Sequence, residues 1–264
     1  MPAPQFILNY TGGKYPESKH TQNIDINYLK YDTIVEPFGG SFGFSRFVFY
    51  KLGHTHLKYK VYDADKGLID FYNHLKQLII EDKHEAFFEE YRKEAKKLHD
   101  ACYYRGTQLN TKKLSHYFNT YKHPDLFIQW CIHKNHVFIN STIRRIAYKR
   151  NAGFTEIFKH TDFICCKCED IPADILYNDT TLVYLDPPYL VTNNSTYDTQ
   201  FDLNTVFETI ERLLSSADCL LVHQYNFLLC RAFKDFNTFV YKKTYGSAKI
   251  VDHVIFYRLS AWFG

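Results

Sequence analysis

Short apolar runs, each followed by a turn or an amphipathic stretch, recur along most of the chain. They predict strands that begin at Thr33, Tyr59 and Leu182, and further strands over 219–222, 239–244 and 251–257. After Asp202, a helical stripe is formed by Leu203, Val206, Phe207, Ile210, Leu213 and Leu214. The last two strands, separated by Gly246, are typical of an antiparallel hairpin. The alternation predicts an α/β fold around a mostly parallel sheet.

One apolar run ends in residues that can carry chemistry. Residues 182–185 are followed directly by Asp186, Pro187, Pro188 and Tyr189. Two prolines cannot continue a ladder of strand hydrogen bonds, so we expect the strand to end there in a stiff turn. Ligands of open parallel sheets bind beyond the carboxyl ends of the strands, which would place Asp186 and Tyr189 in a ligand crevice. Taken alone, these residues also fit an ordinary loop with a packed aromatic side chain.

A glycine-rich turn follows the strand that begins at Thr33, and a helical pattern then runs to Leu52. Glycines let the backbone approach a ligand closely, and the amino terminus of a helix offers N–H groups to it. Such a turn alone often serves only to make the corner between strand and helix. The run over 59–65 carries Asp63, where an acid commonly binds ribose hydroxyls. Near the amino terminus, paired glycines precede Lys14.

The order of these motifs resembles that of the Dam-type (class alpha, D12 family) DNA adenine-N6 methyltransferases. The matching segments are 10–15, 35–43, 61–72 and 168–189, so the resemblance covers nearly the whole chain. It implies a Rossmann-like S-adenosylmethionine-dependent methyltransferase sheet of seven strands, with the last hairpin antiparallel and an inserted helical DNA-recognition domain. It also implies a site-specific enzyme that transfers methyl from S-adenosyl-L-methionine to the N6 amine of an adenine flipped out of double-stranded DNA.

The resemblance also assigns roles to residues. The cofactor-binding residues that it implies are Tyr10, Lys14, Glu36, Pro37, Phe38, Gly39, Gly40, Asp63, Glu169, Asp170 and Asp186. Tyr10 stands where the family usually has tryptophan, and its phenol ring can still stack on an adenine. Asp65 departs from the family's common asparagine. Glu169 and Asp170 both fall where the family recognises the cofactor's adenine, and the sequence leaves open which of them does so.

The proposed reaction explains the residue types at the catalytic turn. The lone pair of an exocyclic adenine amine is delocalised into the ring, so hydrogen-bond acceptors must draw the amine toward tetrahedral geometry. The Asp186 carboxylate and the Pro187 carbonyl can each accept one amino hydrogen, with no need for metal. A base flipped out of the duplex can stack on Tyr189, which Pro188 supports from behind.

Other readings of the same residues stay open. Cytosine-N4 methylation asks the same of Asp186, although family members that favour cytosine more often carry serine there. RNA is a further candidate substrate. A catalytically silent protein that binds cofactor and DNA as a regulator would not need an intact Asp186 and Tyr189. A small-molecule or protein methyltransferase would have no affinity for DNA.

The organisation of the chain predicts where DNA binds. We expect a catalytic domain over 1–75 and 136–264, a helical target-recognition domain over 76–135, and a DNA-contacting hairpin within 141–160. The stretch 91–123 carries eight Lys or Arg against only two acids, a balance that favours contacts with DNA phosphates. The alternative interpretation is an ordinary solvent-exposed helix face. The candidate DNA-binding residues are Lys112, Lys113, Tyr148, Arg150, Asn151 and Tyr197.

Composition narrows the class of protein. The chain has 264 residues, of which 45% are hydrophobic, enough for one large domain with a smaller inserted one. We see no signal-peptide pattern and no long apolar span, so we expect a cytoplasmic protein, or one located wherever the target genome resides. Cys165 and Cys168 have metal-ligand spacing, with Cys131, His133 and His136 as further candidates. We expect no metal, and read the run 163–168 as a buried strand whose thiols pack as hydrophobes.

Overall fold

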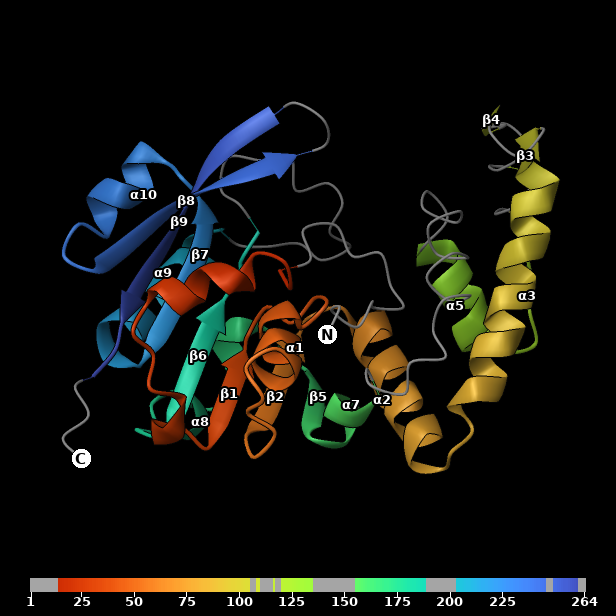
Figure 1. The fold of residues 1–264 in the computed structure, drawn as a ribbon, viewed down its shortest axis with the longest axis horizontal. Helices are drawn as coiled ribbons and strands as arrows, with labels where there is room; N and C mark the ends of the chain where they lie inside the picture. Colours follow the sequence, from red (N-terminus) through yellow and green to blue (C-terminus); the bar gives the residue numbers. More distant parts are fainter. Residues whose placement is uncertain are drawn as a thin grey trace. The chain divides into compact units, whose positions relative to one another are not determined.

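The computed structural model describes residues 14–104, 108–109, 116, 120–134, 155–188, 203–245 and 249–260 (Figure 1). These residues form two compact units. The sheet unit contains the described residues of 13–69 and 160–264, and the helical unit contains those of 70–159. No helix in the described part of the chain is long and apolar enough to cross a membrane.

The sheet unit is built around a seven-stranded sheet. In spatial order its strands are β5 (Thr161–Cys165), β2 (Lys58–Asp63), β1 (Thr33–Glu36), β6 (Thr181–Leu185), β7 (Cys219–Gln224), β9 (Lys249–Arg258) and β8 (Asn237–Tyr245). The first five run parallel, while β9 is antiparallel to β7 and β8 is antiparallel to β9. This confirms the predicted fold, including its closing antiparallel hairpin.

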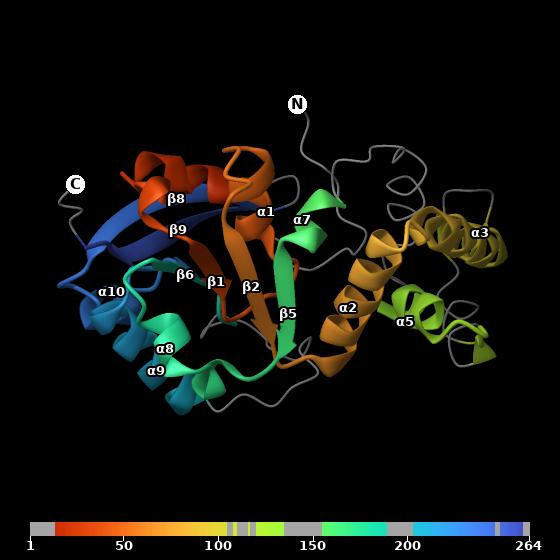
Figure 2. The ribbon, with the colours of Figure 1, turned by 90° about the horizontal axis from the view of Figure 1, so that it is seen from below.

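Helices cover both faces of this sheet (Figure 2). On one face lie α1 (Gly43–Tyr50) and the short 3-10 helices η1 (Ser18–Asn23) and η2 (Tyr28–Lys30), drawn in red and orange. On the other lie α8 (Ala173–Leu176), α9 (Leu203–Ser216) and α10 (Phe227–Ala232). Because both faces are covered, every residue of β6 is buried and the strand reads as a continuous apolar run.

The predicted apolar stripe of α9 forms part of the core. Leu213 and Leu214 are fully buried in a cluster with Leu221 of β7 and Phe256 of β9. Phe233, which follows α10, lies in the same cluster and packs edge-on against Phe256, with ring centroids 5.4 Å apart. Burying a side chain of this size contributes about 1.5–3 kcal/mol each, so this layer fixes α9 and α10 against the carboxyl-terminal half of the sheet.

The order of the strands creates a topological switch point. The chain passes from β1 to β2 and then to β5 on one side, and afterwards returns to the other side of β1 to form β6. The crevice that binds ligands in open α/β sheets lies beyond the carboxyl ends of the strands at such a reversal. Here those are the ends of β1 and β6, which pair in parallel with Val35 opposite Val183.

One prediction about the edge of the sheet was wrong. The run 163–168 was expected to be a buried strand, but β5 ends at Cys165 and Cys168 already lies in the 3-10 helix η5 (Cys168–Asp170). Cys165 is exposed, while Cys168 is buried. Cys165 lies on the same strand face as the buried Thr161 and Phe163, but it is the last residue of an edge strand, where less of the chain covers its side chain.

The helical unit holds most of α2 (Lys66–Ile80), together with α3 (His84–Cys102), α5 (Leu126–Lys134), α7 (Glu156–Lys159) and the two-residue strands β3 (Tyr103–Tyr104) and β4 (Gln108–Leu109). Aromatic packing stabilises it, with Trp130 stacked on Phe71 at 5.1 Å between ring centroids. On α3, Arg92, Lys93 and Lys97 form ion pairs with glutamates three residues earlier. This part of the basic stretch is therefore an ion-paired helix face.

Candidate active site

Acidic side chains gather at the carboxyl edge of the sheet, as the sequence predicts. Glu36 is the last residue of β1, Asp63 is the last residue of β2, and Asp186 directly follows β6. Parallel strands end at the same edge, so these three residues, far apart in the sequence, line the same end of the sheet around the switch point. Pro187 and Pro188 are both buried, which fixes the turn that carries Asp186.

The glycine-rich turn packs tightly against the end of β2. A Cβ added at Gly39 would lie 2.4 Å from Val61 Cγ1 and 3.0 Å from the carbonyl oxygen of Tyr62. The Gly39 N–H donates to that same oxygen at 2.7 Å. Gly40 has a φ of 45°, in the left-handed region that favours glycine. A side chain at Gly39 would therefore push the turn away from the sheet.

Asp63 fixes this turn from the neighbouring strand. Its Oδ2 accepts a hydrogen bond from the Gly40 N–H at 2.8 Å, and its Oδ1 accepts one from the Asp65 N–H at 2.9 Å. The Asp63 side chain is half-buried, and it is well placed to bind hydroxyl groups beside the turn.

The Glu36 carboxylate binds the amino-terminal turn of α1. Its Oε1 accepts a hydrogen bond from the Ser45 N–H at 2.7 Å, and the residue is buried. Burial raises the pKa of Glu36 to about 7, with hydrogen bonds from Ser45 opposing the rise and the charge of Asp186 adding to it. The residue therefore titrates near neutral pH and senses the charge of Asp186. Pro37 beside it is buried and Phe38 is half-buried.

Lys14 and Asp186 form an ion pair in the site. The Lys14 Nζ lies 2.7 Å from the Asp186 Oδ1, and the two side chains are 7% and 19% exposed. Burial raises the pKa of Asp186 to about 6, while Lys14 opposes the rise by charge and hydrogen bonding. The carboxyl group is therefore mostly ionised at pH 7, and it is a strong hydrogen-bond acceptor in a largely buried place.

The backbone around Lys14 is held against α1. A Cβ added at Gly43 would lie 2.5 Å from the Tyr15 nitrogen and 2.9 Å from the Lys14 nitrogen and carbonyl carbon. The Ser18 N–H and hydroxyl both donate to the Lys14 carbonyl oxygen, at 2.8 and 2.7 Å. The Arg46 guanidinium lies 5.1 Å from the centre of the Tyr15 ring. Sequence reasoning gave no role to Gly43, although its place at the first turn of a helix is the signal for close packing.

The two candidate residues for adenine recognition differ in exposure. Both lie in η5, which begins three residues after the end of β5, the strand that pairs with β2. Glu169 is half-buried and accepts a hydrogen bond from the Cys168 thiol at 3.2 Å, whereas Asp170 is exposed. The Cys166 N–H donates to the Asp63 carbonyl oxygen at 3.1 Å, which ties this segment to the end of β2.

Some predicted site residues lie outside the described part of the chain. They are Tyr10, Lys112, Lys113, Tyr148, Arg150, Asn151, Tyr189 and Tyr197. One charged pair that sequence reasoning missed also lies at this end of the sheet: Glu17 forms an ion pair with Lys243 of β8. Neither residue belongs to a motif, and only the folded chain brings them together.

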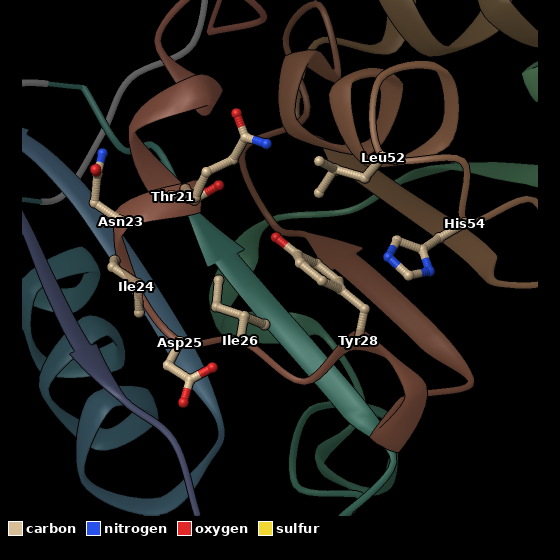
Figure 3. Close-up of a pocket in the computed structure, with 9 residues that line it drawn as sticks. Thr21, Asn23, Ile24, Asp25, Ile26, Tyr28, Leu52 and His54 are labelled. Atoms are coloured by element: carbon tan, nitrogen blue, oxygen red, sulfur yellow. The ribbon is translucent and has the colours of Figure 1, made fainter.

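A separate cavity of about 510 Å³ is open on the α1 face (Figure 3). It is lined by Thr21, Gln22, Asn23, Ile24, Asp25, Ile26, Tyr28, Leu52 and His54. Leu52 and His54 follow the carboxyl end of α1, so the cavity lies at the opposite end of that helix from the glycine-rich turn. It contains none of the predicted catalytic or cofactor-binding residues, and the Tyr28 ring stacks on His54 within its wall.

The fold and this site define an α/β methyltransferase of the Rossmann-like type. The profile of the D12 class N6 adenine-specific DNA methyltransferases matches residues 10–251, so the chain belongs to this family. It is therefore a methyltransferase enzyme with DNA as its substrate. Among solved structures, an rRNA methylase from Streptococcus thermophilus aligns with 95% of this chain and 98% of its own, at 10% identity and a TM-score of 0.38. A comparison with curated proteins gave no match.

Proposed function

We propose that this enzyme transfers a methyl group from S-adenosylmethionine to the N6 amine of an adenine that is flipped out of double-stranded DNA within a specific short sequence. The observation that carries the proposal is the position of Asp186. Its carboxylate follows the central strand β6 at the switch point of the sheet, on a turn of two buried prolines, and it pairs with Lys14. An acceptor held this rigidly suits a reaction that depends on orientation.

The residues around the glycine-rich turn fit a nucleoside-bearing methyl donor. When bound, S-adenosylmethionine supplies an electrophilic methyl group on a sulfonium centre. The turn of Gly39 and Gly40 packs closely against the end of β2, Asp63 offers carboxylate oxygens for ribose hydroxyls, and Glu169 is a half-buried acceptor in η5. Because Asp170 is exposed, we assign recognition of the donor's adenine to Glu169. Tyr10 would stack on that adenine.

Asp186 would act on the target amine through hydrogen bonding. A carboxyl group with a pKa of about 6 is roughly nine-tenths ionised at pH 7, so it can accept an amino hydrogen. The Pro187 carbonyl would accept the second hydrogen, and together they would turn the nitrogen lone pair toward the methyl donor. Asp186 need not remove a proton first, because the amine becomes acidic only once it carries the new methyl group.

Lys14 and the amine of the target base would both donate to the Asp186 carboxylate, so Lys14 must either leave this group or share it. An ammonium group has three donors, so Lys14 can keep one contact to Asp186 and turn another toward a bound anionic group. The carboxylate of the methyl donor's methionine end is such a group. We therefore assign Lys14 to the donor side of the site and Asp186 to the target base.

Reaching this site requires the target base to leave the duplex. Flipping a base costs a few kcal/mol, and stacking on an aromatic side chain recovers roughly 1–3 kcal/mol. We assign that stacking to Tyr189, which follows the two prolines, with Tyr197 as a further DNA contact. The assignment to adenine rests on the family to which the chain belongs.

We propose that the region 76–135 and a hairpin within 141–160 recognise the target sequence, with Lys112 and Lys113 on phosphates and Tyr148, Arg150 and Asn151 on the bases. Neutralising Lys112 and Lys113 together should reduce the slope of log affinity against log salt concentration by about 2. Arg92 and Lys93 form a matched control pair on α3, because Glu89 and Glu90 already neutralise them. Their replacement by Gln should change the slope less.

The test of the proposed function is a transfer assay with tritium-labelled methyl groups on S-adenosylmethionine. Duplex DNA, duplex DNA without adenine and RNA of the same length are the three substrates. After digestion to nucleosides, we expect the label in N6-methyldeoxyadenosine from the first substrate alone. Label in N4-methyldeoxycytidine, or in RNA only, would overturn the assignment of substrate.

A further inference from the structure

Two buried ion pairs lie at the catalytic end of the sheet. One joins Lys14 to Asp186, and the other joins Glu17 to Lys243 of β8. The Lys243 and Glu17 side chains are only 17% and 9% exposed, comparable with the first pair. Lys14 and Glu17 belong to the same short turn, so one segment of the chain contributes a cation to one pair and an anion to the other.

The Tyr241 hydroxyl also fixes Glu17, in addition to Lys243. The Tyr241 hydroxyl donates to its Oε2 at 3.0 Å, and the His253 Nδ1 lies 3.6 Å from the same oxygen. Tyr241 and His253 are direct neighbours across β8 and β9. The His20 ring stacks on Tyr241 at 4.1 Å. The Glu17 carboxylate is therefore bound to the closing hairpin, and its ion pair with Lys243 orients the Lys243 side chain.

Several titratable groups from the elements packed at this end of the sheet act on Asp186 or on the groups beside it. They are Lys14 and Glu17 from the amino-terminal segment, Glu36 from β1, Tyr184 from β6, His223 from β7, Tyr241 and Lys243 from β8, and His253 from β9. Burial lowers the pKa of His223, and it lowers that of His253 to about 4, so both imidazoles are neutral at pH 7. Burial also raises the pKa of Tyr184 far above neutrality.

Among these groups, the two lysines are the cations at pH 7, and both act on Asp186. Burial lowers the pKa of Lys243, while the charges of Glu17 and Asp186 both raise it. A buried ammonium without a carboxylate is costly, so a Lys243 that lost Glu17 would turn to another acid within reach. Asp186 is the other acid whose charge acts on Lys243, and one of its oxygens already binds Lys14.

We propose that Glu17 is a positioning residue for catalysis: by holding Lys243, it keeps a second ammonium away from the Asp186 carboxylate and so preserves an oxygen that can accept the amine of the target base. This inference rests on the proposed function of Asp186. A carboxylate bound by two ammonium groups is a weaker acceptor for a neutral amine, because its lone pairs are already engaged by charged donors. Glu17 would thus act on the reaction by keeping Lys243 in place, without touching either substrate.

The proposal makes a specific prediction for a double-mutant cycle. Glu17→Gln keeps the size of the side chain and its capacity to accept from Tyr241, but it releases Lys243. We expect kcat to fall at least about tenfold. Lys243→Gln alone should leave kcat at pH 8 within about twofold of the unmodified enzyme, since removing the second ammonium also protects Asp186. The double variant should recover most of the activity that Glu17→Gln loses.

A second readout needs no substrate. The chain is labelled with ¹³C at the aspartate carboxyl groups, and the Asp186 resonance is identified by its loss in Asp186→Asn. Glu17 raises and Lys243 lowers the pKa of Asp186. The titration midpoint should therefore move down in Glu17→Gln and up in Lys243→Gln, by about 0.5 to 1 in pH in each case, and return near its original value in the double variant. Glu211→Gln, an exposed change on α9, is the control and should leave the midpoint in place.

Three outcomes would overturn the proposal. The first is a double variant as inactive as Glu17→Gln, which would make Glu17 merely structural. The second is a midpoint that moves in the same direction in both single variants. The third is loss of the folded state in Glu17→Gln, seen as a large fall in Tm, without recovery in the double variant. Failure of the proposed function is distinct, because it would appear as absent transfer to DNA by the unmodified enzyme.

Discussion

Gly39→Ala tests how tightly the glycine-rich turn must pack for the donor site to exist. The added methyl group would lie 2.4 Å from Val61 Cγ1 and 3.0 Å from the Tyr62 carbonyl oxygen. Carbon atoms in contact prefer about 3.5–4.0 Å, so a separation must open by roughly 1 Å. Val61 is fully buried in β2 and its χ1 is stiff, so the turn has to move instead.

The expected cost follows from this overpacking. Forcing an additional methyl group into a well-packed interior destabilises a protein by about 1–3 kcal/mol. The displaced turn also carries the Gly40 N–H that donates to Asp63, so the ribose side of the donor site should be distorted. We expect urea denaturation to show this loss of stability, and calorimetry to show weaker binding of S-adenosylmethionine, by about tenfold or more.

Two further variants separate packing from backbone strain. Gly53 has a φ of 80° and no atom within 4 Å of an added Cβ. Gly53→Ala should therefore cost about 1–2 kcal/mol through its left-handed backbone alone and leave donor binding unchanged. Val61→Ala removes the obstructing methyl groups, and in combination with Gly39→Ala it should restore part of the affinity. A Gly39→Ala variant with unchanged stability and unchanged affinity would refute the reasoning.

Three other predictions concern the site and its support. Burial raises the pKa of Asp186 to about 6, and the reaction needs the ionised form of this residue. We therefore expect kcat/KM to fall about tenfold for each pH unit below 6. A flat profile from pH 8 to 5 would contradict this. Gly43→Ala should lower transfer activity, because the added Cβ would displace the backbone of Lys14. This loss is expected even though alanine has the better helix propensity. An unchanged rate would show that this contact is dispensable. Asp218→Asn should lower the free energy of unfolding at pH 7 by about 1.5–3 kcal/mol, since Asp218 accepts charged and neutral hydrogen bonds from Lys30 and Ser260. These contacts hold the pKa of Asp218 below its usual range, so its stabilising contribution is lost as pH falls through that pKa, and denaturation curves at pH 7 and 3 should show the gap closing.

The strands and the catalytic turn follow directly from local patterns. The apolar run before Asp186 predicts β6, because a strand buried on both faces has no polar positions and two prolines must end it. The closing hairpin was also predicted, and β8 and β9 extend slightly beyond the expected ranges. Each of these signals lies within a few neighbouring residues.

Other features depend on contacts between residues that are far apart in the sequence. The pairing of Lys14 with Asp186 and of Glu17 with Lys243 joins residues that are more than 170 positions apart in the sequence. The exposure of Cys165 follows from its place at the end of the edge strand β5, which its own sequence does not reveal. On α3, Arg92 and Lys93 pair with Glu89 and Glu90, which lie just before the basic stretch 91–123 and are therefore not part of its composition.

The central claim is that the Asp186 carboxylate orients the amine of the target base. Its most direct test is single-turnover methyl transfer by Asp186→Ala at pH 8, measured beside the affinity for S-adenosylmethionine. We predict that the transfer rate falls by at least about a hundredfold, as expected when a preorganised hydrogen-bonding group is removed, while the dissociation constant for the donor changes by less than about threefold. Transfer at an unchanged rate would contradict the account.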